Sequence, residues 1–288
     1  MSKYRQGGII SPTLMNITLD GMEKVIKYHF PTWKWQCVNF IRYADDFVIT
    51  AKTPQILDKV KFVVKNFLKE RGLTLSKEKT KIVHISNGFD FLSHNIRKYK
   101  GKLLIKPSKN AIKEAKYKLS KIVQSNLGAK PDIMIAKLNN FLRGWGNYHR
   151  HNVAQEIFSS IDYYLWRLLG RWCKRRHQNK SWKWIREKYF TASGENCTFS
   201  ALTTDKKKGK LLIHKLRRLA YVPIIRHTKI RSDANPFDKA DKEYLEKFKE
   251  KKKKKFAKSQ QKQKILTNFA DIEKQLLKLW KLQPATPR

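Results

Sequence analysis

The spacing of hydrophobic positions divides the chain into three regions of different character. Residues 1–105 mix helical and strand patterns, residues 106–230 have mostly helical patterns, and residues 231–288 form a strongly charged tail. Apolar residues three or four positions apart indicate one face of a helix, whereas short alternating runs indicate strands. The pattern predicts an α+β first domain, a mainly helical second domain, and a basic tail that is helical or disordered.

In the first region, two helices are predicted to begin at a hydroxyl residue followed by proline. Ser11 is expected to cap one helix, with Pro12 in its first turn, and Thr53-Pro54 begins another that ends at Gly72. The first helix has these apolar positions: Leu14, Ile17, Met22, Val25 and Ile26. The second has these: Ile56, Leu57, Val60, Val63, Val64, Phe67 and Leu68.

Strand patterns occupy short stretches of the same region. Apolar and β-branched residues flank a central Asp45-Asp46, which indicates a hairpin or a strand end. The predicted strand segments are 40–50, 81–85, 89–96 and 103–105.

The second region contains three predicted helices with capping signals. Ser108 is expected to cap the first and Ser181 the last, while the middle helix ends in the basic segment 173–177. The first buries Ala111, Ile112, Ala115, Leu119, Ile122 and Val123. The second carries Val153, Ile157, Ile161, Tyr164, Leu165, Leu168 and Trp172, and the third carries Trp182, Trp184, Ile185 and Tyr189.

The tail has a different composition. Residues 251–255 are an unbroken lysine run, which is typical of a solvated helix face or of a disordered arm. One last amphipathic helix is predicted from Ile265, Phe269, Ile272, Leu276, Leu277 and Trp280.

Charge narrows the class of partner. Lys and Arg total 64 against 23 Asp and Glu, a formal net charge of +41. Phosphates neutralise such a surface and release counterions, so a nucleic acid is the expected partner. Aromatic residues make up 12% of the chain, and because bases stack on such rings the mixture favours RNA. For any single ring, burial in the core is the competing interpretation.

The cysteine spacing and the hydropathy of the chain indicate in which cellular compartment the protein works. Cys37, Cys173 and Cys197 are widely spaced and form neither a disulfide framework nor a Cys-x-x-Cys metal site. No run of about 18 apolar residues occurs, and residues 1–5 lack the apolar stretch of a signal peptide. We expect a reducing compartment, either a bacterial cytoplasm or an organellar matrix.

The strongest local signal is Tyr43-Ala44-Asp45-Asp46 between apolar segments. Phosphoryl transfer to a growing nucleic acid uses two divalent metals, and Mg²⁺ prefers carboxylate oxygens. Two consecutive aspartates at a tight hairpin hold carboxylates at one end of a sheet. An ordinary turn is the competing interpretation, because Asp is a common turn residue.

Neighbouring motifs change that balance through their order and spacing. Gln6-Gly7, Ser11-Pro12 and Asn16 precede the aspartates, whereas Gly72-Leu73, Lys79-Thr80 and Phe89-Asp90-Phe91-Leu92 follow them. This order resembles the later motifs of reverse transcriptases. Further on, Leu138 to Tyr148, Lys180-Ser181-Trp182 with Lys188-Tyr189-Phe190, and Arg226-His227 with Ala234-Asn235-Pro236-Phe237 resemble the maturase-specific domain of group II intron proteins.

The resemblance implies roles for individual palm residues. Asp45 and Asp46 would help to hold Mg²⁺ in a two-metal site, and Gln6 and Gly7 would lie near the template and incoming nucleotide. Lys79 would face the triphosphate, although an ordinary exposed lysine is the competing interpretation. The pair Phe91 and Leu92 would shape the turn that positions the primer end, where Ser93 stands in place of the family's usual glycine.

In the maturase-like region, basic residues are the expected RNA contacts: Arg143, His149, Arg150, Arg175 and Arg176. Trp145 is expected to pack between helices, with the neighbouring glycines permitting close contact, whereas Tyr148 either packs in the same way or contacts RNA. The implied domains are therefore the C-terminal part of a reverse transcriptase palm over 1–105, a thumb and maturase (domain X-like) RNA-binding region over 106–230, and a basic tail over 231–288, truncated before an endonuclease domain.

The resemblance leaves the enzyme question open. Relatives carry fingers and an earlier palm aspartate that completes the metal site, and no residue here is assigned to it. Paired cysteines of an endonuclease do not follow Trp280, so no endonuclease activity is expected. One hypothesis is an RNA-directed DNA polymerase (a nucleotidyltransferase) and maturase fragment that binds intron RNA for splicing and mobility. Its further partners would be a DNA target and an upstream fragment with the fingers. The alternative is a non-catalytic RNA-binding splicing factor or a degenerate truncated copy.

Overall fold

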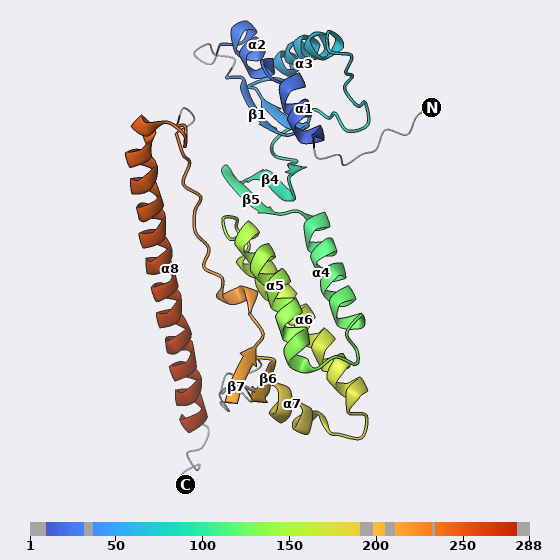
Figure 1. Ribbon diagram of the computed structural model, residues 1–288, viewed down its shortest axis with the longest axis vertical. Coiled ribbons are helices and arrows are strands. Elements are labelled where there is room, and N and C mark those ends of the chain that lie inside the picture. Colours follow the sequence, from blue (N-terminus) through green and yellow to red (C-terminus); the bar gives the residue numbers. More distant parts are fainter. Residues whose placement is uncertain (1–9, 32–36, 191–197, 205–210, 232–233, 281–288) are drawn as a thin grey trace, which may run out of the picture. The chain divides into compact units, whose positions relative to one another are not determined.

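The computed structural model describes residues 10–31, 37–190, 198–204, 211–231 and 234–280. The chain forms two compact units that divide between Phe91 and Leu92. Figure 1 shows helices and strands in both units, which agrees with the expected α+β class.

The first unit has helices α1 (Ser11–Thr18), α2 (Met22–His29) and α3 (Pro54–Lys69), with strands β1 (Asn39–Tyr43), β2 (Asp46–Thr50) and β3 (Phe89–Phe91). Its core is formed by α2, α3 and the inner side of the β1–β2 hairpin, through residues such as Met22, Ile26, Val60 and Val64. Thr53 precedes α3 and Pro54 opens it, as predicted. The helical periodicity of α3 is confirmed, since five of its apolar residues are buried.

Three predictions for this unit are wrong. The apolar side over 14–26 belongs to two helices, because Gly21 adopts a φ of 82° between them, and Leu14 and Ile17 on α1 are largely exposed. Ser11 lies inside α1, which has no side-chain cap bond. The segment 81–85 is irregular rather than a strand. Its Ile82 and Val83 are 44% and 39% exposed, so they bury too little to hold a strand in place.

The second unit begins with a hairpin of β4 (His94–Tyr99) and β5 (Lys102–Pro107), which confirms the strand predicted at 103–105. Three long helices follow: α4 (Lys109–Gln124), α5 (Pro131–His149) and α6 (Gln155–Arg176). Their facing sides form the largest buried cluster, which includes Leu119, Leu138 and Leu165. Val153, predicted to belong to this core, precedes α6 and is 51% exposed.

The predicted serine caps in this unit are confirmed. Ser108 precedes α4, and its hydroxyl accepts a hydrogen bond from the Ala111 N–H at 3.1 Å. Ser181 precedes α7 (Trp182–Phe190), and its hydroxyl accepts from the Trp184 N–H at 3.3 Å. Each hydroxyl satisfies one of the amide groups that a helix start leaves without an intrahelical partner.

A second hairpin departs from the helical pattern expected for 106–230. Strands β6 (Ser200–Thr204) and β7 (Leu211–Lys215) pair antiparallel, and a short 3-10 helix, η1 (Leu219–Tyr221), follows. Phe199 and Ala201 are buried against the helices, so the hairpin closes one side of the core. The Asn139 side chain fixes its end, because it donates to the Lys215 carbonyl and accepts from the Arg217 N–H.

The tail forms one long helix, α8 (Lys239–Trp280), shown at the red end of the chain in Figure 1. The lysines of 251–255 lie on this helix and are exposed, so the solvated helix face is the arrangement adopted. Side chains of the amphipathic pattern predicted from Ile265 to Trp280 lie outside the described residues. Within the part of the chain that the structure describes, no helix combines the length and apolar character needed to cross a membrane.

Candidate functional site

The two palm-like aspartates lie at the tip of the β1–β2 hairpin. Tyr43 pairs with Asp46, so Ala44 and Asp45 form a two-residue loop. Ala44 has a φ of 54°, as the tight primed turns of such hairpins require at their first loop position. The hairpin predicted from the sequence is confirmed, and both carboxylates are exposed at its tip.

The donor chemistry of this tip fits part of a magnesium site. Two adjacent carboxylates supply hard oxygen ligands, which Mg²⁺ prefers. In the described ranges, however, no cluster of three or more acidic, histidine or cysteine side chains could hold a metal ion. Asp45 and Asp46 alone offer fewer ligands than a metal site needs, so their role in metal binding stays a prediction.

The other predicted palm residues have mixed outcomes. Gln6 and Gly7 lie outside the described residues. Lys79 lies in an exposed turn, where its N–H is 3.4 Å from the Ser76 hydroxyl that accepts from it. Its assignment to a nucleotide phosphate stays a prediction.

The expected primer-positioning turn is built from left-handed backbone. Leu92 and Ser93 have φ values of 47° and 64°. The family's glycine at the second position is understandable, since glycine adopts this region without a steric penalty. Ser93 follows the same path, and its carbonyl accepts from the Ser108 N–H at 2.9 Å.

The C-terminal end of α5 holds this turn and the hairpin after it. The Tyr148 hydroxyl donates to the Leu92 carbonyl at 2.9 Å, and its ring stacks on His94 with centroids 5.0 Å apart. The Asn152 amide nitrogen is 2.7 Å from Nδ1 of His94, and the Val153 N–H donates to the Ile105 carbonyl.

The expectation that His149 contacts RNA needs correction. Its side chain is 1% exposed, and its ring packs 4.5 Å from Trp145 and at a right angle to His94. Burial, reinforced by repulsion from His94, lowers the pKa of His149 to about 4. His149 is therefore a neutral core group, and Trp145 packs against the core as predicted.

Surface arginines of the helical region have differing surroundings. Arg143 on α5 and Arg175 on α6 are exposed. Arg176 is also exposed, but it donates to the Ala129 carbonyl at 2.8 Å and lies over the Trp172 ring. Their contacts with RNA stay predictions.

Arg150 is half-buried, unlike the other predicted RNA contacts. Its Nε and Nη2 atoms are buried without a hydrogen-bond partner, and its guanidinium lies 4.3 Å from the centre of the Phe256 ring on α8. Burial and the nearby Arg217 lower the pKa of Arg150. A desolvated cation without an acceptor is costly, so an anionic ligand would stabilise it.

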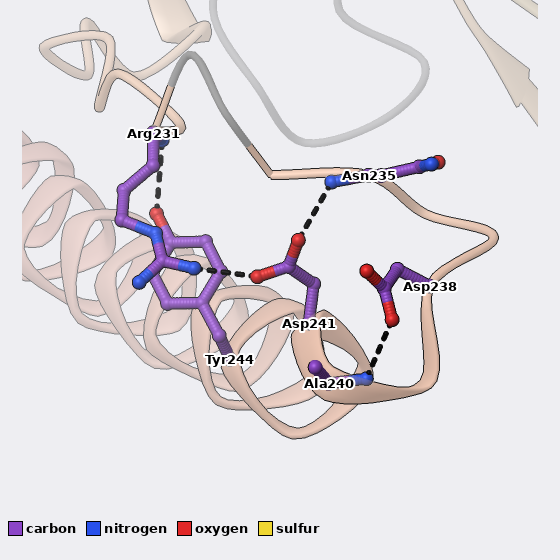
Figure 2. Close-up of polar contacts among 6 residues, drawn as sticks. All are labelled: Arg231, Asn235, Asp238, Ala240, Asp241 and Tyr244. Carbon is purple, nitrogen blue, oxygen red and sulfur yellow. Dashed lines mark hydrogen bonds and ion pairs between the residues drawn. The ribbon is translucent and has the colours of Figure 1, made fainter.

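The Asn235-Pro236-Phe237 segment directly precedes α8 (Figure 2). The Asp241 carboxylate accepts from the Asn235 N–H at 2.8 Å and from the Arg231 guanidinium. The Tyr244 hydroxyl accepts from the Arg231 N–H at 3.1 Å, and the Asp238 carboxylate accepts from the Ala240 N–H at 3.0 Å. Asp238 therefore caps α8, and Asp241 ties the Asn235 segment to the first turn of the helix, which the sequence alone did not indicate.

The sequence did not indicate two polar residues that organise the junction of β4 with the end of α5, namely His94 and Asn152. Neither residue carries a motif signal for a partner, and their contact with each other joins positions 58 residues apart in the sequence. Only the fold brings them together, at the junction of β4 and the end of α5.

Two protein families match successive parts of the chain. The model of the reverse transcriptase (RNA-dependent DNA polymerase) family matches residues 2–96, and that of the group II intron maturase-specific domain matches residues 112–190. The first includes the aspartate hairpin and the second includes α5, most of α4, α6 and α7. In this order along the chain, the two matches support the group II intron reverse transcriptase and maturase family.

One curated relative is Protein YkfC of Escherichia coli (strain K12). The two are 30% identical over 122 residues, which is 32% of this chain and 31% of the relative. The chain thus spans about a third of the length of that relative.

Proposed function

We propose that the second unit binds group II intron RNA as a maturase and thereby promotes splicing. The observation that carries this proposal is the match to the maturase-specific domain over residues 112–190. Helices in that range bury their apolar sides against one another and leave basic side chains exposed on the outer sides, including Arg143, Arg167, Arg171 and Arg175. A rigid helical surface with exposed cations fits recognition of structured RNA by shape and phosphate contacts.

The competing explanation is attraction of a +41 chain to any polyanion. Competition binding of a folded group II intron RNA against a random RNA of equal length separates the two, if it is measured across a salt series. Salt weakens the phosphate contribution steeply, whereas contacts to shape and 2′-hydroxyls persist. We expect the intron RNA to be preferred at high salt, and equal binding at every salt concentration would contradict a maturase role.

Variants of exposed arginines test where the preference arises. Replacing Arg143 and Arg175 by Ala should reduce the preference for intron RNA, because both lie in the maturase-specific range. Replacing Lys69 and Lys77 of the first unit by Ala removes the same charge and serves as the matched control. A preference equally affected by both pairs would assign the effect to net charge.

We also propose that Asp45 and Asp46 bind divalent metal for RNA-directed DNA polymerase chemistry. Their exposure at a rigid hairpin tip and the reverse transcriptase match over residues 2–96 support this role. When bound, the metal would stabilise charge that develops on a transferring phosphoryl group. The two carboxylates would hold the metal, and substrate phosphates, water and the earlier palm aspartate that relatives carry would supply the further ligands.

Metal binding is tested without relying on activity. Mn²⁺ titration should broaden the NMR signals of residues 43–47 selectively, and Asp45→Asn with Asp46→Asn should remove the broadening. Asp58→Asn and Asp90→Asn in the same unit are the control. Unchanged broadening in the hairpin variant would leave the non-catalytic RNA-binding alternative as the better description.

A further inference from the structure

A cavity of about 320 Å³ lies beside the C-terminal hairpin of the second unit. Residues of α6 form one wall, and the segment from Leu216 to Ala220 forms the other. Its volume is at the lower end of the range of roughly 300 to 1,000 Å³ for small-molecule sites. Neither the palm residues nor the predicted RNA-contacting residues of α5 line it.

The α6 wall is aromatic. Tyr163 is 61% exposed and stacks on Trp166 with centroids 6.1 Å apart and an interplanar angle of 18°. Trp166 is anchored from the other side, because it packs edge-on against Phe190 and Trp182. An exposed ring supported by a fixed indole is a suitable platform for a nucleobase, because bases stack on aromatic faces.

A carboxylate is fixed among the lining groups. Oδ1 of Asp162 accepts from the Leu219 N–H at 2.9 Å, and Oδ2 accepts from the Ala220 N–H at 2.8 Å. These bonds orient Asp162, and each of its oxygens retains a further acceptor position. Burial raises the pKa of Asp162, while the two amide donors and Arg218 oppose that increase.

Positive charge lies at the same cavity. Arg217 is exposed, and Arg218 is half-buried, with its guanidinium donating to the Tyr221 hydroxyl at 2.9 Å. Both arginines line the cavity together with Asp162. The aromatic face can stack on the flat base of a nucleotide, and the two guanidinium groups can neutralise its phosphate. The oriented acceptor can pair with hydrogen-bond donors on the edge of the base.

We propose that this cavity holds a single unpaired guanine of the bound RNA. The inference rests on the proposed maturase function and names a feature of the RNA that the protein would recognise. Guanine stacks on Tyr163, its adjacent N1–H and N2–H groups donate to Asp162, and its phosphate lies near Arg217. Adenine, cytosine and uracil each present no more than one donor beside acceptors on that edge, so they leave Asp162 less well paired.

Saturation-transfer NMR of the full chain with GMP, AMP, CMP and UMP tests the base preference. We expect the strongest transfer to the base protons of GMP. Tyr163→Ala should weaken GMP binding by at least about fivefold, because stacking of one base contributes at least that much. Tyr163→Phe should retain binding, since it keeps the ring. Tyr117→Ala is the matched control, because Tyr117 is 65% exposed on α4 and does not line the cavity.

The same preparations are used for intron RNA competition, so that the two ideas fail separately. If GMP and UMP bind equally weakly, or if Tyr117→Ala has the effect of Tyr163→Ala, the guanine site is overturned whether or not the intron preference remains. If GMP binds as expected but intron RNA is not preferred over random RNA, the maturase proposal fails and a guanine nucleotide site stands. A circular dichroism melting curve identical to that of the parent chain confirms that each variant is folded.

Discussion

Several residues of the second unit follow backbone paths that side chains normally avoid. Leu92, Ser93 and Lys100 all have φ values between 43° and 64°, in the left-handed region. Such conformations persist only where surrounding contacts fix them. Around Leu92 and Ser93 those contacts are the Tyr148 hydroxyl and the Ser108 amide, each 2.9 Å from a turn carbonyl.

Ser93→Gly should therefore stabilise the chain. Removing the Cβ relieves a penalty of about 1–2 kcal/mol, offset in part by the extra freedom that glycine gives the unfolded chain. We expect a net gain of about 0.5–1 kcal/mol in chemical denaturation. Ser125→Gly is the control, since Ser125 has a φ of −74° and should gain nothing. Equal effects of both changes would contradict the strain argument.

The buried His149 makes stability depend on pH. Its pKa is lowered to about 4 in the folded state, below the ordinary value of 6.5, so folding favours the neutral ring. This contribution is fully present above about pH 6.5 and is lost as the pH falls toward 4, with a size on the order of 2–3 kcal/mol. The free energy of unfolding of His149→Gln should therefore fall less between pH 7 and pH 4 than that of the parent chain. Parallel pH profiles would disprove the assignment.

Among the elements, α5 packs against η1 at a distance that leaves no room for a side chain at Gly146. A Cβ added at Gly146 would lie 2.9 Å from Leu219 Cδ2 and 3.3 Å from Val222 Cγ2, whereas one at Gly144 would meet nothing within 4 Å. The two glycines directly precede and directly follow Trp145. Only Gly146 is required by packing.

Alanine at these two positions should consequently have opposite effects. Gly146→Ala overpacks the contact with η1 and should destabilise the chain by about 1–3 kcal/mol. Gly144→Ala lies on an open helix surface and should stabilise it by about 0.5–1 kcal/mol. Thermal melting of both variants measures the difference, and a shift of the same sign in both would refute this reading of the α5–η1 contact.

Long periodic helices were predictable because their own spacing specifies which side is buried. The apolar positions of α3 and α4 repeat over 16 residues each, and Ser108 marks one start. The β6–β7 hairpin was not, since no motif comparable to Tyr43-Ala44-Asp45-Asp46 marks its turn and each short strand depends on its partner.

The residues of the candidate site also fall into those that the sequence predicted and those that it did not. Asp45 and Asp46 were predictable because a hairpin tip is a local property of the chain. The burial of His149 was not, since it depends on His94, which is more than fifty residues away in the sequence. The Asp162 cavity likewise needs α6 and η1 together, and no local pattern indicates their contact.

For the whole molecule, the longest unbroken run of positive charge lies in the tail. Residues 251–255 add five exposed lysines on α8. Charge of this kind attracts phosphates regardless of sequence. The lysine run therefore raises the affinity for any RNA and does not add to the preference for intron RNA.

Replacing all five lysines by glutamine should weaken the binding of intron RNA and random RNA by similar factors. It should also make the slope of the logarithm of affinity against the logarithm of salt concentration shallower by up to about 4 or 5. Filter binding over a salt series gives both quantities. A selective loss of intron RNA binding would instead assign α8 a specific role.

The contacts at the end of α5 have a mechanical consequence. Tyr148, Asn152 and Val153 each bond the stretch from Leu92 to Ile105, through a hydroxyl, an amide side chain and a backbone N–H. These three attachments, at different points of the stretch, oppose rotation of the hairpin relative to the end of α5. We therefore expect the β4–β5 hairpin and α5 to move together, so that a force applied to the helix would reach the Leu92–Ser93 turn.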